Sequence, residues 1–247
     1  MLPFDRAEPL FRQFGEVSTS ADLAALLDGI ARELGFRDWA LTHHVDIRRN
    51  PGKAIRLHNY PGEWVEYYDA NCLGLSDPVH RASHVTSQGF TWSRIPKLIA
   101  LTPRDRDILA RGGSSGIGDG FTVPAHVPGE SHGSCSFANP AGVRLPTDDL
   151  PLAQLIGTFA FEAARRVWRV RPDAPVAPLT DRQRECLVWV ARGKTDWEIA
   201  KILGVTHHTV VMHLKHARHR FGGGKRTSLV AQALYDTSIG FPDIFRH

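Results

Sequence analysis

The chain has 247 residues, a net charge of +4 and 42% hydrophobic residues, which is enough for two ordinary domains that each bury a core. Its three cysteines are too few and too widely spaced for a disulfide framework or a zinc site, and they suit a reducing compartment. The start lacks the apolar core of a signal peptide and no apolar run approaches a membrane span, so we expect a soluble, cytoplasmic protein that does not bind membranes.

The charge is uneven along the chain. Residues 179–247 hold eleven Lys/Arg against six Asp/Glu, whereas the first 178 residues are close to neutral. A basic module joined to a neutral one is typical of a polyanion-binding domain attached to a domain with another ligand.

The first 170 residues predict an α+β domain, an α/β/α sandwich whose mostly antiparallel sheet is covered by helices. The first elements expected are a helix at 21–34 capped by Ser20, strands at 39–47 and 54–59 around a turn at 50–53, and helices after Pro61 and from Asp77. A short strand near Phe90, a helix at 103–110, a glycine loop at 112–120, strands at 121–127 and 134–138, and a helix at 150–170 follow. The proline-rich stretch 171–178 predicts an extended linker, which places the domains at 1–170 and 179–247.

Three short helices are expected within residues 179–221. Thr180 with Gln183 forms a capping box for the first helix, which ends at Gly193. Thr195 or Asp196 caps the second helix, Gly204 allows the turn after it, and Thr206 caps the third. This spacing predicts a helix-turn-helix with its partner helix, which becomes a four-helix bundle with a further helix near 229–235.

The third of these helices has two faces of opposite character. Its apolar stripe is Val210, Leu214, Ala217 and Phe221, and the opposite stripe is His208, Val211, Lys215 and Arg218. In a helix-turn-helix the second helix of the pair enters the DNA major groove by its N-terminal part, so the outward stripe is expected to face DNA. The alternative is an ordinary three-helix bundle with a solvated basic face.

These helices resemble the DNA-binding domain of LuxR-type regulators. The family's Leu-Thr-x-Arg-x-x-Glu-x-Leu opening matches residues 179–187, its Gly-x-Thr-x-x-Glu-Ile-Ala segment matches 193–200, and its Thr-Val-x-x-His element matches 209–213. The resemblance implies DNA contacts by Thr195, His207, His208, Thr209, Val211, Met212, Lys215 and Arg218. Two residues depart from the family: Asp196 replaces an asparagine, and Val211 replaces a lysine, so a phosphate contact is lost and a thymine methyl contact becomes available.

Aromatic and polar side chains of the first domain lie at expected turns and element ends, where they can converge on a cavity. They are Tyr60, Trp64, Tyr68, Asp77 and Trp92, with Ser134 and Ser136 on the last strand. Two simpler interpretations remain open: the aromatic residues are ordinary core residues, and Asp77 before a proline is a helix cap.

The order Tyr-x-x-x-Trp, Asp-Pro and Trp is similar to the acyl-homoserine-lactone-binding domain of the same family. The resemblance implies that Trp64 donates to the lactone carbonyl, Asp77 accepts from the ligand amide, and Tyr60 donates to the amide carbonyl. Ser136 or Ser134 would assist Tyr60, Trp92 would pack against the lactone ring, and Tyr68 would line the acyl-chain side.

Taken together, the resemblance implies a quorum-sensing transcriptional regulator whose effector is an N-acyl-homoserine lactone and which needs no cofactor. Its partners would be a palindromic DNA site, a second copy of the chain and RNA polymerase, with dimer contacts along 150–170 and near 229–235. Val65 and Val79 stand where some relatives carry a cation and a threonine, which argues against recognition of a 3-oxo substituent. A non-lactone effector remains an alternative.

Three further interpretations have less support. Serines 131, 134 and 136 near His126 and His132 would suit a hydrolase, but no nucleophile elbow or fixed acid accompanies them. The histidines lack a convergent tetrahedral pattern, so no metal site is predicted. The third is a protein-interaction module without a ligand, fused to DNA-binding helices.

Overall fold

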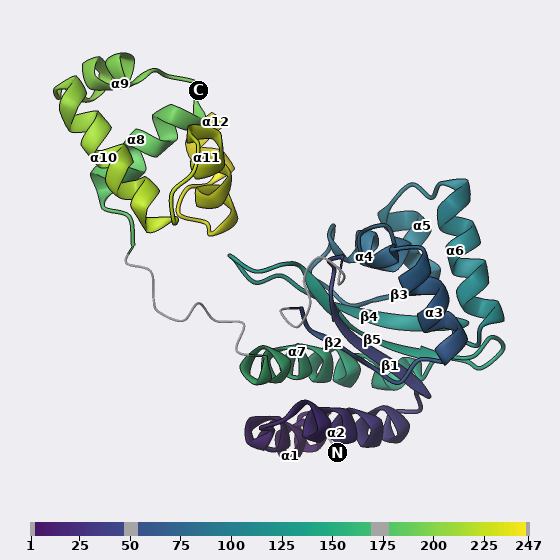
Figure 1. Ribbon diagram of the computed structural model, residues 1–247. Coiled ribbons are helices and arrows are strands. Elements are labelled where there is room, and N and C mark those ends of the chain that lie inside the picture. The colour runs from purple at the N-terminus through teal and green to yellow at the C-terminus, as the bar shows by residue number, and fades with distance from the viewer. Residues whose placement is uncertain (1–2, 47–53, 169–177, 246–247) are drawn as a thin grey trace. The chain divides into compact units, whose positions relative to one another are not determined.

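The computed structural model describes residues 3–46, 54–168 and 178–245 (Figure 1). The chain divides into two compact units, the first made of residues 1–127 and 131–171 and the second mainly of 172–247. The turn expected at 50–53 lies outside the described residues, as does the linker expected at 171–178 except for Pro178. Within the described residues, no helix has the length and apolar character needed to cross a membrane.

A five-stranded antiparallel sheet forms the centre of the first unit. The strands are β1 (Asp38–His43), β2 (Arg56–His58), β3 (Phe90–Thr91), β4 (Asp119–Ala125) and β5 (Gly133–Asn139), in the order β2-β1-β5-β4-β3. The register pairs Ala40 with both His58 and Ser136, and Ser136 with Thr122. These four residues therefore lie in one row across the same face of the sheet.

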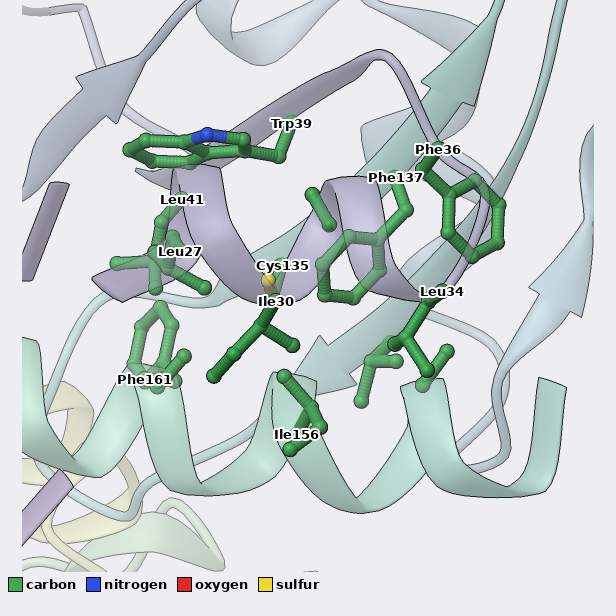
Figure 2. Packing of buried hydrophobic residues seen from close by; sticks show 14 of the residues in the cluster. Leu27, Ile30, Leu34, Phe36, Trp39, Leu41, Cys135, Phe137, Ile156 and Phe161 are labelled. Carbon is green, nitrogen blue, oxygen red and sulfur yellow. The ribbon is translucent and has the colours of Figure 1, made fainter. Parts of the chain in front are cut away.

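The opposite face of the sheet carries the main hydrophobic core. Helices α1 (Pro3–Glu16), α2 (Ser20–Glu33) and α7 (Leu150–Val167) cover this face (Figure 1). Side chains from α2, β1, β5 and α7 interdigitate there, among them Leu27, Leu41, Phe137 and Ile156 (Figure 2). The alternation of strand side chains thus sends one set into this core and leaves the row with Ser136 for the other face.

The other face is covered by short helices from the middle of the chain (Figure 1). They are α3 (Gly62–Ala70), α4 (Pro78–Ser83), α5 (Ile95–Leu98) and α6 (Pro103–Ser114), with single 3-10 turns at Leu73–Leu75 and Trp92–Arg94 and another before α7 at Thr147–Asp149. This arrangement confirms the expected antiparallel sheet covered by helices.

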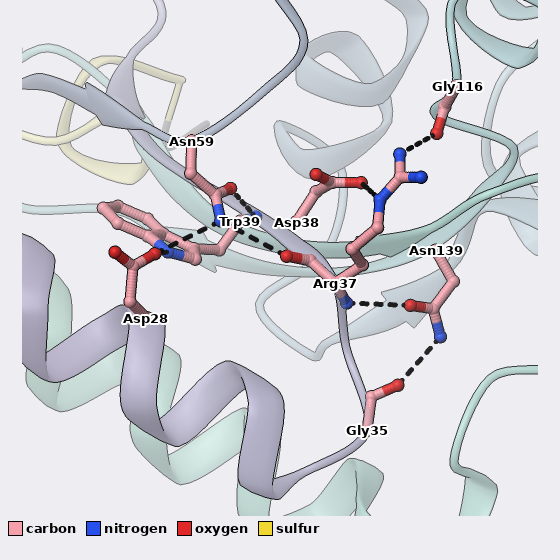
Figure 3. Close-up of polar contacts among 8 residues, drawn as sticks. All are labelled: Asp28, Gly35, Arg37, Asp38, Trp39, Asn59, Gly116 and Asn139. Carbon is pink, nitrogen blue, oxygen red and sulfur yellow. Dashed lines mark hydrogen bonds and ion pairs between the residues drawn. The ribbon is translucent and has the colours of Figure 1, made fainter.

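A polar network ties the ends of the strands together and fixes the chain leading to α3 (Figure 3). The Asn59 side chain accepts from the Trp39 backbone N–H at 2.7 Å and donates to Asp28, which also accepts from the Trp39 indole N–H at 2.7 Å. Asn139 similarly accepts from the Arg37 backbone N–H at 2.9 Å. The residue after Asn59 is therefore held at a defined position at the edge of the sheet.

The second unit consists of helices α8 (Asp181–Ala191), α9 (Asp196–Leu203), α10 (His207–Arg220), α11 (Arg226–Tyr235) and α12 (Phe241–Phe245). The predicted capping box of Thr180 with Gln183 is present, and Thr195 rather than Asp196 caps α9. Gly204 ends α9 at φ +65°, a left-handed conformation that favours glycine, and Thr206 caps α10. The helix-turn-helix expectation is confirmed, and α12 adds a short fifth helix.

Three local expectations were wrong. Thr19, not Ser20, caps α2, because Thr19 forms a capping box with Asp22. The glycine loop expected at 112–120 is shorter, since α6 continues to Ser114 and β4 already begins at Asp119. The first strand ends at His43, short of the expected Ile47, which lies outside the described residues.

Candidate functional site

A cavity of about 390 Å³ lies between the polar row of the sheet and the helices α3 to α6. Its walls combine apolar side chains, such as Trp64, Val79 and Ile108, with several hydrogen-bonding groups. A mostly apolar pocket with a few placed polar groups is the usual form of a small-molecule site.

The structure brings six of the seven predicted ligand residues to this cavity. Tyr60, Trp64, Tyr68, Asp77, Trp92 and Ser136 line it. Ser134 does not line it, and its hydroxyl instead lies 2.9 Å from Nε2 of His44.

Local structure explains how Trp64, Tyr68 and Asp77 reach the same space. Trp64 and Tyr68 are four residues apart on α3, so they project from the same side of the helix, and their rings meet edge to face at 6.1 Å. Asp77 caps α4 through Oδ1, which accepts from the Val79 N–H at 2.7 Å. The carboxylate is therefore a helix cap and a cavity residue at once, since its second oxygen can still accept a hydrogen bond.

Burial controls the charge state of the two phenols in the cavity wall. Burial and the nearby Asp77 carboxylate raise the pKa of Tyr60 well above its ordinary value, and the same two causes raise the pKa of Tyr68. Both hydroxyl groups consequently keep their protons and are hydrogen-bond donors. The Tyr60 hydroxyl also interacts with Ser136.

Trp92 is fixed by a chain of hydrogen bonds to the sheet. Its indole N–H donates to the Thr122 hydroxyl at 2.9 Å, and Thr122 and Ser136 hydroxyls are 2.8 Å apart. The ring lies close over Gly120, where an added Cβ would come within 2.6 Å of Trp92 Cε2. Thr122 was missed from the sequence because only the register of β4 and β5 places it beside Ser136.

Several further cavity residues were also missed. Thr42, Arg56, His58 and His80 line the side near β1 and β2. Period-two alternation in the strands contains a signal for three of them, since residues 40 and 42, and 56 and 58, point to the same face. The sequence does not say which face that is.

Five histidines form a cluster that begins at the cavity wall. His80 stacks on His44 with ring centroids 3.8 Å apart, and Nδ1 of His44 lies 2.8 Å from Nε2 of His84. His132 touches both His84 and His126 at ring distances of 4.6 and 4.8 Å. Burial and the neighbouring histidines lower the pKa of His44 and of His132, and lower that of His84 to about 4.

The predicted DNA-facing residues lie around the N-terminal and outer side of α10. Val210, Leu214 and Ala217 are buried in the core of the second unit. His208, Val211, Lys215 and Arg218 are exposed, while His207, Thr209 and Met212 are half-buried. The two stripes expected from the sequence are therefore present.

Two predicted DNA residues already have partners. The Thr195 hydroxyl donates to Glu198 at 2.8 Å within the cap of α9, and bonds from the Thr195 backbone N–H and hydroxyl lower the pKa of Glu198 to about 2. The ring of His207 stacks on Trp197 at 4.3 Å, and Trp197 is 66% exposed. Trp197 was not expected to take part in this surface.

The unusual Asp196 has an explanation within the second unit. Arg226 at the start of α11 pairs with the Asp196 carboxylate and also donates to the Lys194 carbonyl oxygen. These contacts hold the N-terminus of α11 against that of α9.

The part of the chain that the structure describes contains no group of three or more His, Cys, Asp or Glu side chains arranged to hold a metal ion. The five histidines contact one another through their rings and through the close approach of His44 Nδ1 to His84 Nε2.

A small-molecule cavity in one unit and a helix-turn-helix in the other define a ligand-binding transcriptional regulator, and sequence comparison agrees. The family described as autoinducer binding domain matches residues 19–164, and that described as bacterial regulatory proteins, luxR family, matches residues 177–233. The chain belongs to the LuxR family of quorum-sensing transcriptional regulators with an autoinducer-binding domain.

Named relatives and solved structures are similar over most of the chain. The transcriptional activator protein AhyR of Aeromonas hydrophila is 28% identical over 93% of this chain and 90% of its own length. The transcriptional activator protein BjaR1 of Bradyrhizobium diazoefficiens is 32% identical over 86% and 87%. The crystal structure of Escherichia coli SdiA has a TM-score of 0.67 at 23% identity and covers 96% of this chain and 98% of its own, which supports the fold.

Proposed function

We propose that the first unit binds an N-acyl-homoserine lactone in its cavity. Trp64 donates its indole N–H to the lactone carbonyl, Asp77 accepts from the amide N–H, and Tyr60 with Ser136 donates to the amide carbonyl. Trp92 packs against the lactone ring. Each polar group of a buried ligand costs about 1–3 kcal/mol if it is left unpaired, so this matched set provides both affinity and selectivity.

One observation carries the proposal: two phenols, one carboxylate and two indoles that are separated in the sequence line one cavity of about 390 Å³. They are Tyr60, Tyr68, Asp77, Trp64 and Trp92. The two phenols beside Asp77 are protonated donors, which suits carbonyl oxygens rather than cations.

The deciding experiment expresses the protein with a panel of lactones and identifies by mass spectrometry which compound co-purifies. A stoichiometric, unhydrolysed lactone supports the proposal, and its loss in Trp64→Phe supports the site. Retention of no lactone by wild-type protein would refute it.

We further propose that the protein acts on DNA as a homodimer in the cytoplasm. Two α10 helices related by two-fold symmetry suit a palindromic site whose half-site centres are about ten base pairs, or a multiple, apart. The outward faces of α7 and α11 are the proposed dimer contacts, and RNA polymerase is the proposed partner at promoters. Equal gel-shift affinity for an isolated half-site and the full site would contradict dimeric binding.

A non-lactone amphiphile is the second candidate effector. One solved SdiA structure is described as a complex with octanoyl-rac-glycerol, and that protein shares the fold of this chain. Adding a monoacylglycerol to the mass-spectrometric panel separates the two effector classes. Turnover of the lactone during incubation would instead indicate a hydrolase.

A further inference from the structure

A backbone carbonyl determines which ring nitrogen of His80 carries the hydrogen. Nδ1 of His80 lies 3.0 Å from the carbonyl oxygen of Gly74, at the end of the turn that precedes α4. A carbonyl oxygen only accepts, so Nδ1 carries a hydrogen whether the ring is neutral or charged. In the neutral ring, Nε2 is the acceptor and faces the Thr42 hydroxyl at 3.5 Å.

The Tyr68 hydroxyl oxygen lies 3.3 Å from the same Nδ1 of His80. Because Nδ1 bears a hydrogen, it cannot accept the phenol proton, and the Tyr68 oxygen is the acceptor in this contact. Burial keeps the phenol protonated by raising the pKa of Tyr68. The Tyr68 O–H therefore points its proton away from His80, on a side chain that lines the cavity.

Both rings are held in place by their neighbours. His80 stacks on His44, which is itself fixed by Ser134 at 2.9 Å. The Tyr68 ring lies under the Arg56 guanidinium at 6.0 Å, and Arg56 pairs with Asp69 at 2.8 Å. Because the Tyr68 ring is held in this way, its O–H can donate only to an acceptor at one place in the cavity.

The place of that acceptor follows from the residues around Tyr68. Trp64 lies one helical turn away, and Asp77 lines the same cavity, near enough that its charge, after burial, helps to raise the pKa of Tyr68. In the proposed complex Trp64 and Asp77 bind the lactone carbonyl and the amide, so Tyr68 reaches the acyl chain a few bonds from the amide.

We infer that Tyr68 donates to an oxygen on the third carbon of the acyl chain, so that the receptor prefers 3-oxo- or 3-hydroxy-acyl-homoserine lactones to unsubstituted ones. The inference rests on the proposed lactone-binding function. It reverses the expectation drawn from Val65 and Val79, because the donor comes from a different position on α3. An unsubstituted chain would leave the buried Tyr68 proton without an acceptor.

The test measures dissociation constants for N-hexanoyl-homoserine lactone and its 3-oxo and 3-hydroxy derivatives with the full-length protein. Wild-type protein is expected to bind at least one oxygenated derivative about tenfold more tightly than the unsubstituted lactone. Tyr68→Phe should abolish that preference, so that the ratio of the dissociation constants for the unsubstituted and oxygenated lactones falls to about one. Tyr67→Phe is the matched control, since Tyr67 is on the same helix, packs on Arg111 and does not line the cavity.

The outcomes separate the inference from the function on which it rests. Wild-type binding of all three lactones without preference, or a preference that survives in Tyr68→Phe, overturns the role of Tyr68 and leaves the lactone receptor intact. Failure of wild type to bind any of the three, together with no lactone co-purifying from the panel, overturns both. Ligand-free melting temperatures show whether Tyr68→Phe is folded, and if it is not, the wild-type preference alone decides.

Discussion

Replacing Asp77 separates two tasks that one carboxylate performs. Its Oδ1 caps α4 by accepting from the Val79 N–H at 2.7 Å, and the same side chain lines the cavity where the ligand amide is proposed to bind. Asparagine and serine are helix caps of similar strength to aspartate, whereas alanine is not a cap. The substitutions Asp77→Asn, Asp77→Ser and Asp77→Ala therefore affect stability and ligand binding differently.

The expected sizes follow from the number and type of bonds lost. Asn and Ser keep the cap, so the ligand-free unfolding free energy should change by less than about 0.5 kcal/mol, whereas Ala should lose about 1 kcal/mol. Asn keeps an acceptor but loses the charge, and a charge-assisted bond exceeds a neutral one by about 1 kcal/mol, or roughly fivefold in dissociation constant. Ser is too short to reach the amide and should lose about 2 kcal/mol, or roughly thirtyfold.

Urea unfolding without ligand and calorimetric titration with the co-purifying lactone measure the two effects on the same samples. Ligand affinity should fall in the order Asp, Asn, Ser at position 77, while the unfolding free energy stays nearly constant. Ligand affinity that follows stability, with Asn and Ser both equal to wild type, would mean that Asp77 is a helix cap only.

Acidification should destabilise the first unit, because the folded state lowers the pKa of His84 from its ordinary 6.5 to about 4. The folded state therefore favours the neutral ring: the stability that depends on it is fully present above about pH 6.5 and is lost as the pH falls toward 4. Since His84 is well exposed, its share is about 1 kcal/mol after screening, and urea melts at pH 7.5 and 5 should show a smaller difference in His84→Gln. Lys215→Ala should weaken DNA binding and reduce by about one the slope of log affinity against log salt concentration, while ligand affinity is unchanged. Lys201→Ala, on the exposed side of α9, is the control. A slope equal to that of wild type in Lys215→Ala would show that Lys215 does not contact DNA phosphates. In Gly120→Val, the added Cβ would lie 2.6 Å from Trp92 Cε2 and 2.7 Å from the Phe137 carbonyl oxygen, so both Trp92 and the backbone of β5 must shift. Ligand affinity should fall more than tenfold in titrations, and unchanged affinity would show that the packing of Trp92 and β5 at Gly120 is unimportant for binding.

The pair Trp64 and Asp77 illustrates what kind of site is readable from sequence. Trp64 follows a turn at Pro61 and shares a helix face with Tyr68, and Asp77 precedes a proline that begins α4. Both features are patterns of only a few neighbouring residues, and their order along the chain is the one that the family resemblance uses. Their side chains do line one cavity, although their individual roles stay predictions.

Ser134 shows where such reasoning ends. It lies on the same face of β5 as Ser136, two residues away, and nothing in the sequence favours one of the two serines over the other. The two differ because His44, ninety positions earlier, lies 2.9 Å from the Ser134 hydroxyl, whereas Ser136 meets Thr122 and the cavity. The register of three strands decides this, and no local pattern encodes it.

By itself the sequence determined the caps of α8 to α10, the stripes of α10 and the helix-turn-helix, because capping boxes, glycine stops and 3.6-residue periodicity act between neighbours in the chain. Only the tertiary structure decided that Thr122, His80 and the histidine cluster adjoin the ligand site, since these contacts join segments brought together by strand register and by packing of α3 to α6 on the sheet. The direction of the Tyr68 proton belongs to the same class: it depends on a carbonyl that fixes the proton of a histidine on another helix.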